Sequence, residues 1–508
     1  MNTIREIWDH AVTSYAKLPA VRWLEKKEIV EIRYQELGES ISAIRKGLSA
    51  EGFQGAHICL IGTASVSWIG SYLALTTGQN VAIPLDAGLP AEDLVALLQD
   101  ADAEALFLMP KMAPYAEAFK AQCPKLRKIW LLQEESAEGS ETLADLKAAG
   151  VNTPDVEGRK ASELATLIYT SGTTGKAKGV MLTQTNLAQN VENVKYSKDP
   201  GCVLMTVLPV HHAFCLVMDW LKGFSLGAVL CINDNFMHMI RNMSIYKPQI
   251  MLMVPLMIET IYKKLASVDN SVPKAAVAQQ VFGGNLEIIF TGGAHLDPFY
   301  IEKFEEYGVK VLEGYGMSEC SPVISANTPK ENKPGSIGKP LDNVKIRFVD
   351  DEIQVQGSSV MQGYYKMPKE TEETLAEGWL HTGDKGYLDE DGFLFINGRV
   401  KNLIILSNGE NISPEEIENK LGLSPLVGEV IVTGENNGLT ARIYPDQDVI
   451  KVKNLDEDAV KAGLQAMLDE YNRPQPTYRR ITGLVVRKNP FHRNSTRKIK
   501  RAEAEIDD

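Results

Sequence analysis

Residues 169–180 combine the residue types that bind phosphate. They read Tyr-Thr-Ser-Gly-Thr-Thr-Gly-Lys-Ala-Lys-Gly-Val. Glycines let a backbone approach a ligand closely, and hydroxyls, lysines and backbone N–H groups form a cradle for an anion. A Walker-type loop needs G-x-x-x-x-G-K-[ST], whereas Ala177 follows Gly175-Lys176 here and the glycine spacing differs, so that motif is excluded. The apolar run 164–169 predicts a strand, and the segment from Leu187 predicts a helix. We therefore expect the loop to join a strand end to a helix start.

Length and composition predict an ordinary globular protein of several domains. The chain has 508 residues, 44% of them hydrophobic and 23% charged, which predicts two to four domains or subdomains. A formal net charge of −13 argues against a nucleic-acid partner and against a dedicated anchor to anionic membranes. The 6 cysteines are scattered without C-x-x-C spacing, which favours neither a disulfide framework nor a zinc site. We expect a cytoplasmic location.

No segment has the pattern of a signal peptide or a transmembrane helix. The first ten residues mix charges into an amphipathic pattern, so no secretory signal is expected. The most apolar region, 202–232, is interrupted by His211, His212, Asp219 and Lys222 and never reaches ~18 uninterrupted apolar residues. It is predicted to be buried α/β core, and loose membrane association is left open.

Strand and helix patterns alternate along the first two thirds of the chain. This alternation predicts an α/β fold whose large N-terminal domain consists of parallel sheets covered by helices, with ligand groups where strands such as 309–312 end in glycine-rich turns. Residues 335–400 predict a small antiparallel β subdomain with turns at Asp391-Gly392 and Asn397-Gly398. The remainder predicts a small α+β domain.

The loop closely resembles the phosphate loop of the adenylate-forming superfamily, [ST]-[ST]-G-[ST]-T-G-x-P-K-G, with Ala177 in place of the proline. This superfamily contains acyl-CoA synthetases, adenylation domains and luciferases. Further motifs follow in the family's order over nearly the whole chain. The resemblance implies that the phosphates of ATP are bound by Thr170, Ser171, Gly172, Thr173, Thr174, Gly175 and Lys176.

Two glycine-rich segments resemble the family's adenine-binding strand ends. Tyr315 offers a stacking face, and Glu319 matches the family's Mg²⁺ carboxylate, with the hydroxyl of Thr170 as its partner. Such a hard cation takes oxygen ligands and substrate phosphates. The nucleotide-binding residues implied here are Gly293, Ala294, Glu313, Gly314, Tyr315, Gly316, Met317 and Ser318.

The later motifs resemble segments that bind ribose, rotate the small domain and complete catalysis. Asp384 matches the carboxylate that accepts both ribose hydroxyls, and Arg399 matches an arginine that contacts the nucleotide. Lys401 matches the hinge between a domain 1–400 and a mobile domain 401–508. Gly409 matches the loop lining the pantetheine tunnel. Lys498 matches the catalytic lysine, although Arg497 stands where the family has glycine.

The segment Pro209-Val-His-His-Ala-Phe214 resembles the acyl pocket, where His212 is expected to gate the carboxylate. Relatives that activate amino acids have an aspartate at the start of this segment, and residues 211–214 contain none. A pair of core histidines bonded to backbone groups is the alternative interpretation.

The resemblance is strongest to bacterial long-chain fatty acyl-CoA synthetases. It implies that the chain uses ATP and Mg²⁺ to convert a small-molecule carboxylic acid into an acyl-adenylate. The acid implied is a medium- or long-chain fatty acid. The acyl group then passes to the thiol of CoA, with release of AMP and pyrophosphate. Three alternatives stay open: a carrier-protein phosphopantetheine as acceptor, an aryl or short acid as substrate, and a degenerate nucleotide-binding regulator without catalysis.

Overall fold

The computed structural model describes residues 1–170, 177–269, 271–405, 411–435, 438–493 and 499–506. The chain forms two compact units, and each is described by itself. Unit 1 contains residues 1–346, 355–380 and 390–394, and unit 2 contains 347–354, 381–389 and 395–508. The predicted hinge at Lys401 concerns a motion and stays a prediction.

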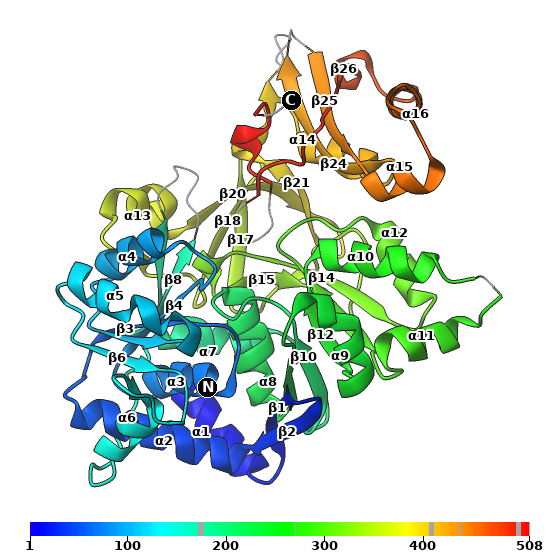
Figure 1. Cartoon of the computed structure of the whole chain (residues 1–508). Coiled ribbons are helices and arrows are strands. Elements are labelled where there is room, and N and C mark those ends of the chain that lie inside the picture. Colours follow the sequence, from blue (N-terminus) through cyan, green and yellow to red (C-terminus); the bar gives the residue numbers. More distant parts are fainter. Residues whose placement is uncertain (171–176, 270, 406–410, 436–437, 494–498, 507–508) are drawn as a thin grey trace. The chain divides into compact units, whose positions relative to one another are not determined.

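The first large sheet of unit 1 has a parallel centre and antiparallel edges (Figure 1). Parallel strands buried on both faces read as continuous apolar runs, as Ile250–Met253 does. Within the described residues its order is β16 (Lys339–Pro340), β15 (Val323–Ala326), β14 (Lys310–Gly316), β13 (Ile288–Thr291), β12 (Ile250–Met253), β10 (Val203–Thr206), β11 (Val229–Ile232), β1 (Pro19–Glu25) and β2 (Glu28–Arg33).

The second large sheet of unit 1 carries the predicted phosphate loop. Its strands β8, β4, β3, β5, β6 and β7 are parallel, and β9 and β19 add antiparallel pairings at the β8 edge. Its order in the described chain is β19 (Gly363–Tyr364), β9 (Lys178–Thr183), β8 (Leu164–Thr170), β4 (Val81–Leu85), β3 (His57–Ile61), β5 (Ala105–Leu108), β6 (Lys128–Leu131) and β7 (Glu141–Thr142).

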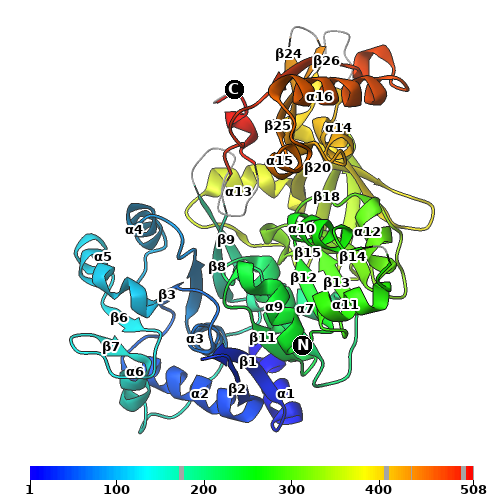
Figure 2. The same ribbon diagram turned by 45° about the vertical axis from the view of Figure 1, so that its right-hand side comes forward.

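Helices cover both sheets, as the alternating pattern predicted (Figure 2). None of the described helices is long and apolar enough to cross a membrane. The helices of unit 1 are α1 (Ile4–Tyr15), α2 (Tyr34–Ala50), α3 (Val66–Thr76), α4 (Ala91–Asp100), α5 (Ala116–Gln122), α6 (Leu143–Ala149), α7 (Gln184–Asn193), α8 (Lys222–Ser225), α9 (Met239–Tyr246), α10 (Pro255–Ala266), α11 (Lys274–Phe282), α12 (Pro298–Glu305) and α13 (Pro368–Thr374).

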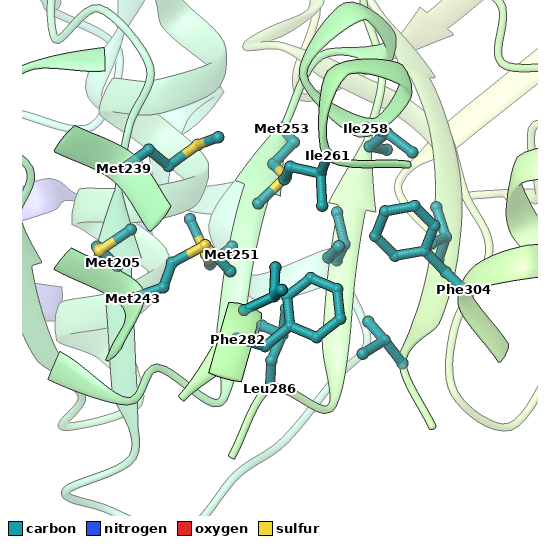
Figure 3. Packing of buried hydrophobic residues seen from close by; sticks show 14 of the residues in the cluster. Met205, Met239, Met243, Met251, Met253, Ile258, Ile261, Phe282, Leu286 and Phe304 are labelled. Carbon is teal, nitrogen blue, oxygen red and sulfur yellow. The ribbon is translucent and has the colours of Figure 1, made fainter. Parts of the chain in front are cut away.

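Methionines fill much of the core between the first sheet and α9–α12. Figure 3 shows Met205, Met243, Met251 and Met253 together, with Phe282 beside them. Unbranched thioether side chains adapt to irregular gaps between helices and a twisted sheet. The predicted core region 202–232 is confirmed, because β10, β11 and the π-helix Phe214–Leu221 between them are almost entirely buried.

Unit 2 contains the C-terminal segment and most residues of a four-stranded sheet. The remaining residues of that sheet belong to unit 1. That sheet has the order β17 (Val344–Val349), β18 (Glu352–Gly357), β20 (Leu380–Leu388) and β21 (Leu394–Arg399). The predicted turn at Asn397-Gly398 is wrong, because both residues belong to β21. Gly398 has φ 147°, and a Cβ there would lie 2.3 Å from Ser413 Oγ, so this glycine permits a close approach rather than a turn.

The C-terminal segment has the predicted α+β character. A sheet of β24, β25 and β26 packs with α14 and α16 around a small apolar core. Its elements are β22 (Ile404–Ile405), β23 (Asn411–Ile412), α14 (Pro414–Leu421), β24 (Val427–Glu435), β25 (Gly438–Pro445), α15 (Gln447–Lys453), α16 (Glu457–Asn472) and β26 (Ile481–Val486). The α/β fold class is confirmed.

Candidate active site

The predicted phosphate loop lies between two antiparallel strands. β8 and β9 pair as a hairpin, with Thr170 opposite Lys178. The expectation that the loop leads directly into a helix is wrong, because β9 intervenes and α7 begins only at Gln184. Residues 178–183 form a strand because Val180 and Leu182, two positions apart, point to the same face of the sheet and are both buried. Ser171, Gly172, Thr173, Thr174, Gly175 and Lys176 lie outside the described residues, and their contacts with phosphate stay predictions.

Around the end of this hairpin, unit 1 gathers a carboxylate, a phenol and an ammonium group. Glu319 lies in a 3₁₀ turn, Ser318–Cys320, and its Oε1 accepts a hydrogen bond of 2.7 Å from the Tyr364 hydroxyl. The Nζ of Lys178 lies 4.7 Å from the centre of the Tyr364 ring, within the range of a cation–π contact. Thr170, the other predicted Mg²⁺ ligand, is the strand partner of Lys178. Lys178 is one of the two lysines of the predicted phosphate cradle, whereas Tyr364 lies outside every motif identified in the sequence.

The predicted adenine segment is a strand over most of its length. β14 extends to Gly316 rather than ending near residue 312, because it continues in an antiparallel pairing with β15. A Cβ on Gly316 would lie 1.9 Å from the carbonyl oxygen of Pro322. The glycine is therefore required by the neighbouring backbone, whatever ligand binds. Tyr315 is 9% exposed, and Gly293 and Ala294 follow β13.

Glu313 is a buried carboxyl group inside β14. Its Oε2 has no hydrogen-bond partner among the described residues. Burial raises the pKa of Glu313 to about 8, and this effect outweighs backbone hydrogen bonds from Gly335 and Leu296 that lower it. The carboxyl is therefore mainly protonated at neutral pH, and it can donate a hydrogen bond as well as accept one.

The predicted acyl segment ends at Phe214, the first residue of the π-helix, and approaches the end of β13. The Cζ of Phe214 lies 4.0 Å from the position that a Cβ on Gly292 would occupy. His212 is half-buried, and its ring centre lies 5.5 Å from that of His211. His211 Nε2 lies 3.8 Å from Asp86 Oδ2, yet burial lowers the pKa of His211 against the effect of Asp86. A neutral imidazole is therefore favoured at His211.

In unit 2, two of the predicted nucleotide-binding residues pair with each other. Arg399 Nε lies 2.8 Å from Asp384 Oδ1, and the Asp384 side chain is 6% exposed. The pairing fixes a buried carboxylate whose two oxygens suit a cis-diol. Lys401 lies in the 3₁₀ turn Val400–Asn402. Gly409 lies outside the described residues.

Lys498 also lies outside the described residues, but both flanks of its segment are anchored. Arg493 Nη2 lies 2.8 Å from Glu429 Oε1, and Arg501 forms an ion pair with Glu418. Arg493 is therefore engaged within unit 2. Among the described residues after 498, Ala504 is buried against Ile431, whereas Lys500, Glu505 and Ile506 are exposed.

Comparison with known proteins finds two family models in tandem. The model "AMP-binding enzyme" matches residues 8–365, and "AMP-binding enzyme C-terminal domain" matches residues 401–507. The long-chain-fatty-acid–CoA ligase FadD15 of Mycobacterium bovis is 26% identical over 456 residues, covering 80% of this chain and 75% of that protein. The peroxisomal long chain acyl-CoA synthetase 7 of Arabidopsis thaliana is 29% identical, covering 89% and 74%.

Solved structures share this fold over almost the whole chain. The anthranilate CoA ligase AuaEII, in complex with anthranoyl-AMP, superimposes with a TM-score of 0.84 at 19% identity. The match covers 99% of this chain and 97% of that one.

Proposed function

The chain belongs to the AMP-binding enzyme family and is an AMP-forming acid–CoA ligase, and from this premise we propose that its acid is a medium- or long-chain fatty acid. The observation that carries the proposal is the likeness to fatty-acid ligases over 80% and 89% of the chain. The acyl segment supports it, because residues 211–214 contain no carboxylate to bind an ammonium group.

In the first half-reaction, an oxygen of the substrate carboxylate attacks the α-phosphorus of ATP. A bond forms between that oxygen and phosphorus, the bond to the bridging oxygen breaks, and pyrophosphate leaves. Lys498 stabilises the negative charge that builds on the α-phosphate, and Asp384 accepts hydrogen bonds from the ribose hydroxyls. The catalysis is mainly positioning and electrostatics, and no covalent enzyme nucleophile takes part.

The donor atoms near the hairpin fit a Mg²⁺ ion. Thr170 supplies a hydroxyl and Glu319 a carboxylate, and hard cations prefer such oxygens together with phosphates. Among the described residues, Oε1 of Glu319 is already hydrogen-bonded to Tyr364, while no hydrogen bond to Oε2 is present. When bound, Mg²⁺ would neutralise phosphate charge as pyrophosphate leaves.

In the second half-reaction, the thiol of CoA attacks the acyl carbonyl carbon and AMP leaves. The small domain is proposed to rotate about Lys401 between the two steps, and Gly409 is proposed to leave room for the pantetheine arm. A cytoplasmic location completes the proposal. All 6 cysteines, which lie in the described part of the chain, are buried and free, which supports it.

Release of AMP and pyrophosphate across saturated C2–C18 acids and several aryl acids, with and without CoA, tests this function. Turnover that requires CoA and is fastest with long chains is the expected result. Turnover confined to aryl or short acids would overturn the choice of substrate. Pyrophosphate exchange without CoA-dependent turnover would assign the acceptor thiol to a carrier protein instead.

A further inference from the structure

We propose that Tyr364 is a positioning residue that holds the carboxylate of Glu319 in its metal-binding orientation. The inference rests on the proposed function, in which Glu319 is a ligand of the Mg²⁺ that accompanies ATP. It adds a residue to which neither the sequence motifs nor the comparisons assign a role.

The backbone places Tyr364 directly on the hairpin that carries the phosphate loop. In β19, Tyr364 pairs with Val180 and Gly363 pairs with Met181, so β19 is the third strand beside β8 and β9. A strand hydrogen-bonded in register to its neighbour has little freedom to slide. The phenol is therefore fixed relative to the base of the loop.

From this strand, the side chain reaches the 3₁₀ turn that carries Glu319. The hydroxyl donates a hydrogen bond of 2.7 Å to Oε1, and the two residues are 5% and 8% exposed. A hydrogen bond to a carboxylate is stronger than one between neutral groups, and a buried site strengthens it further. A phenol, whose ordinary pKa is about 10, is protonated at physiological pH, so Tyr364 is the donor to this carboxylate.

A second link joins the same segment to the backbone of the turn. The N–H of Met361 donates to the carbonyl oxygen of Glu319 at 2.9 Å. Residues 361–364 thus bind Glu319 at its backbone and at its carboxylate. The position of Oε2, the oxygen left for a cation, follows from these two contacts together.

The ring of Tyr364 also holds a positive charge at this site. Lys178 Nζ lies over the ring at 4.7 Å, and Lys178 is paired with Thr170 across the hairpin. One aromatic side chain therefore contacts Glu319, one predicted Mg²⁺ ligand, and also Lys178, the strand partner of Thr170, the other predicted ligand. Its hydroxyl orients the carboxylate, and its face restrains the lysine next to the threonine.

The neighbouring Tyr365 provides a matched control. Its hydroxyl also donates to a carboxylate, Asp102 Oδ2, at 2.9 Å. Asp102 is additionally paired with Lys125 and Lys366, and it has no assigned part in the chemistry. Tyr365→Phe therefore removes a comparable hydrogen bond one residue away from Tyr364.

The test compares Tyr364→Phe, Tyr365→Phe and Glu319→Gln in the full chain. ATP binding is measured by calorimetry at a series of Mg²⁺ concentrations and again in EDTA, and thermal unfolding is recorded for each variant. Tyr364→Phe should weaken the Mg²⁺-dependent part of binding by about tenfold, as loss of a hydrogen-bond partner to a metal ligand does. Metal-free ATP binding should be unchanged, and Tyr365→Phe should match the parent chain.

The double variant Glu319→Gln/Tyr364→Phe separates orientation from general stability. If Tyr364 acts through Glu319, its removal adds little once the carboxylate is gone, whereas an independent structural effect would add in full. Tyr364→His keeps a ring N–H donor and should retain more Mg²⁺ affinity than Tyr364→Phe. If Tyr364→Phe does not fold, the histidine variant still tests the inference.

Two outcomes overturn the inference in different ways. If Glu319→Gln alters the Mg²⁺ dependence and Tyr364→Phe does not, the positioning role fails while the proposed function stands. If Glu319→Gln also leaves it unchanged, the assignment of Glu319 as a metal ligand fails, and the inference fails with it.

Discussion

Asp219 is a carboxyl group in the middle of the protein core. It lies on the π-helix, is 0% exposed, and neither Oδ atom has a hydrogen-bond partner among the described residues. Burial raises its pKa from 3.8 to about 8, against smaller lowering effects of Thr206 and Cys215. The folded state therefore holds a proton that the unfolded chain releases between these values. The contribution to stability is complete below pH 4 and is lost as the pH rises towards 8.

Asp219→Asn should accordingly stabilise the protein increasingly as the pH rises. Relative to the parent, the free energy of unfolding should grow by roughly 1.4 kcal/mol per pH unit between pH 4 and 8. Urea unfolding at several pH values in that window measures it, with Asp458→Asn on the exposed face of α16 as the control. A difference that does not vary with pH would contradict the assigned pKa.

Under the proposed function, the carboxylate of Asp384 binds the cis-diol of the ribose. Asp384→Asn should weaken ATP binding by roughly 10- to 100-fold, because hydrogen bonds to a charged acceptor are lost. The variant should also lose the preference for ATP over 2′-deoxy-ATP, which calorimetry can measure. Arg399→Lys keeps a positive charge beside Asp384 and should preserve that preference. Equal loss of both nucleotides in Asp384→Asn would indicate a structural role.

At the scale of elements, the pairing of β14 with β15 explains why residue 316 is a glycine. The family motif would instead attribute this glycine to nucleotide binding. Gly316→Ala should destabilise the protein by about 1–3 kcal/mol, because the new methyl overlaps the Pro322 carbonyl. Gly314→Ala is the matched comparison in the same strand. There, the nearest atom to a Cβ is Ser325 O at 3.3 Å, and a smaller loss is expected. If Gly316→Ala kept its stability in urea but lost ATP binding, ligand approach rather than strand packing would explain the glycine.

For the whole molecule, the proposed rotation about Lys401 can be separated from adenylation. Lys401→Pro fixes φ near −65° and removes freedom at the proposed hinge, so one of the two half-reactions should fail while the other continues. Pyrophosphate exchange reports adenylation, and CoA-dependent release of AMP from preformed acyl-adenylate reports thioester formation. Lys401→Ala should support both. Equal activity of the proline variant in both assays would place the hinge elsewhere.

The sequence by itself determined the features that depend on local residue order. The loop 169–180 and the motifs up to Lys498 established the family, because short motifs keep their residue types and order along the chain. The apolar run 164–169 predicted β8, and the apolar region 202–232 predicted buried core, because the spacing of apolar residues along the chain reflects which faces of an element are buried. The α/β class followed from the alternation of strand and helix patterns.

Only the tertiary structure decided which distant residues meet. The bond between Tyr364 and Glu319 joins residues 45 positions apart, and it depends on β19 pairing with β9, which no local pattern encodes. The strand after the loop was missed because the alternation that includes Val180 and Leu182 is confined to the short run 178–183 before α7 begins. The sequence likewise did not reveal that the Asp219 carboxyl is buried without a hydrogen-bond partner among the described residues, because the desolvation of a carboxyl group depends on everything packed around it.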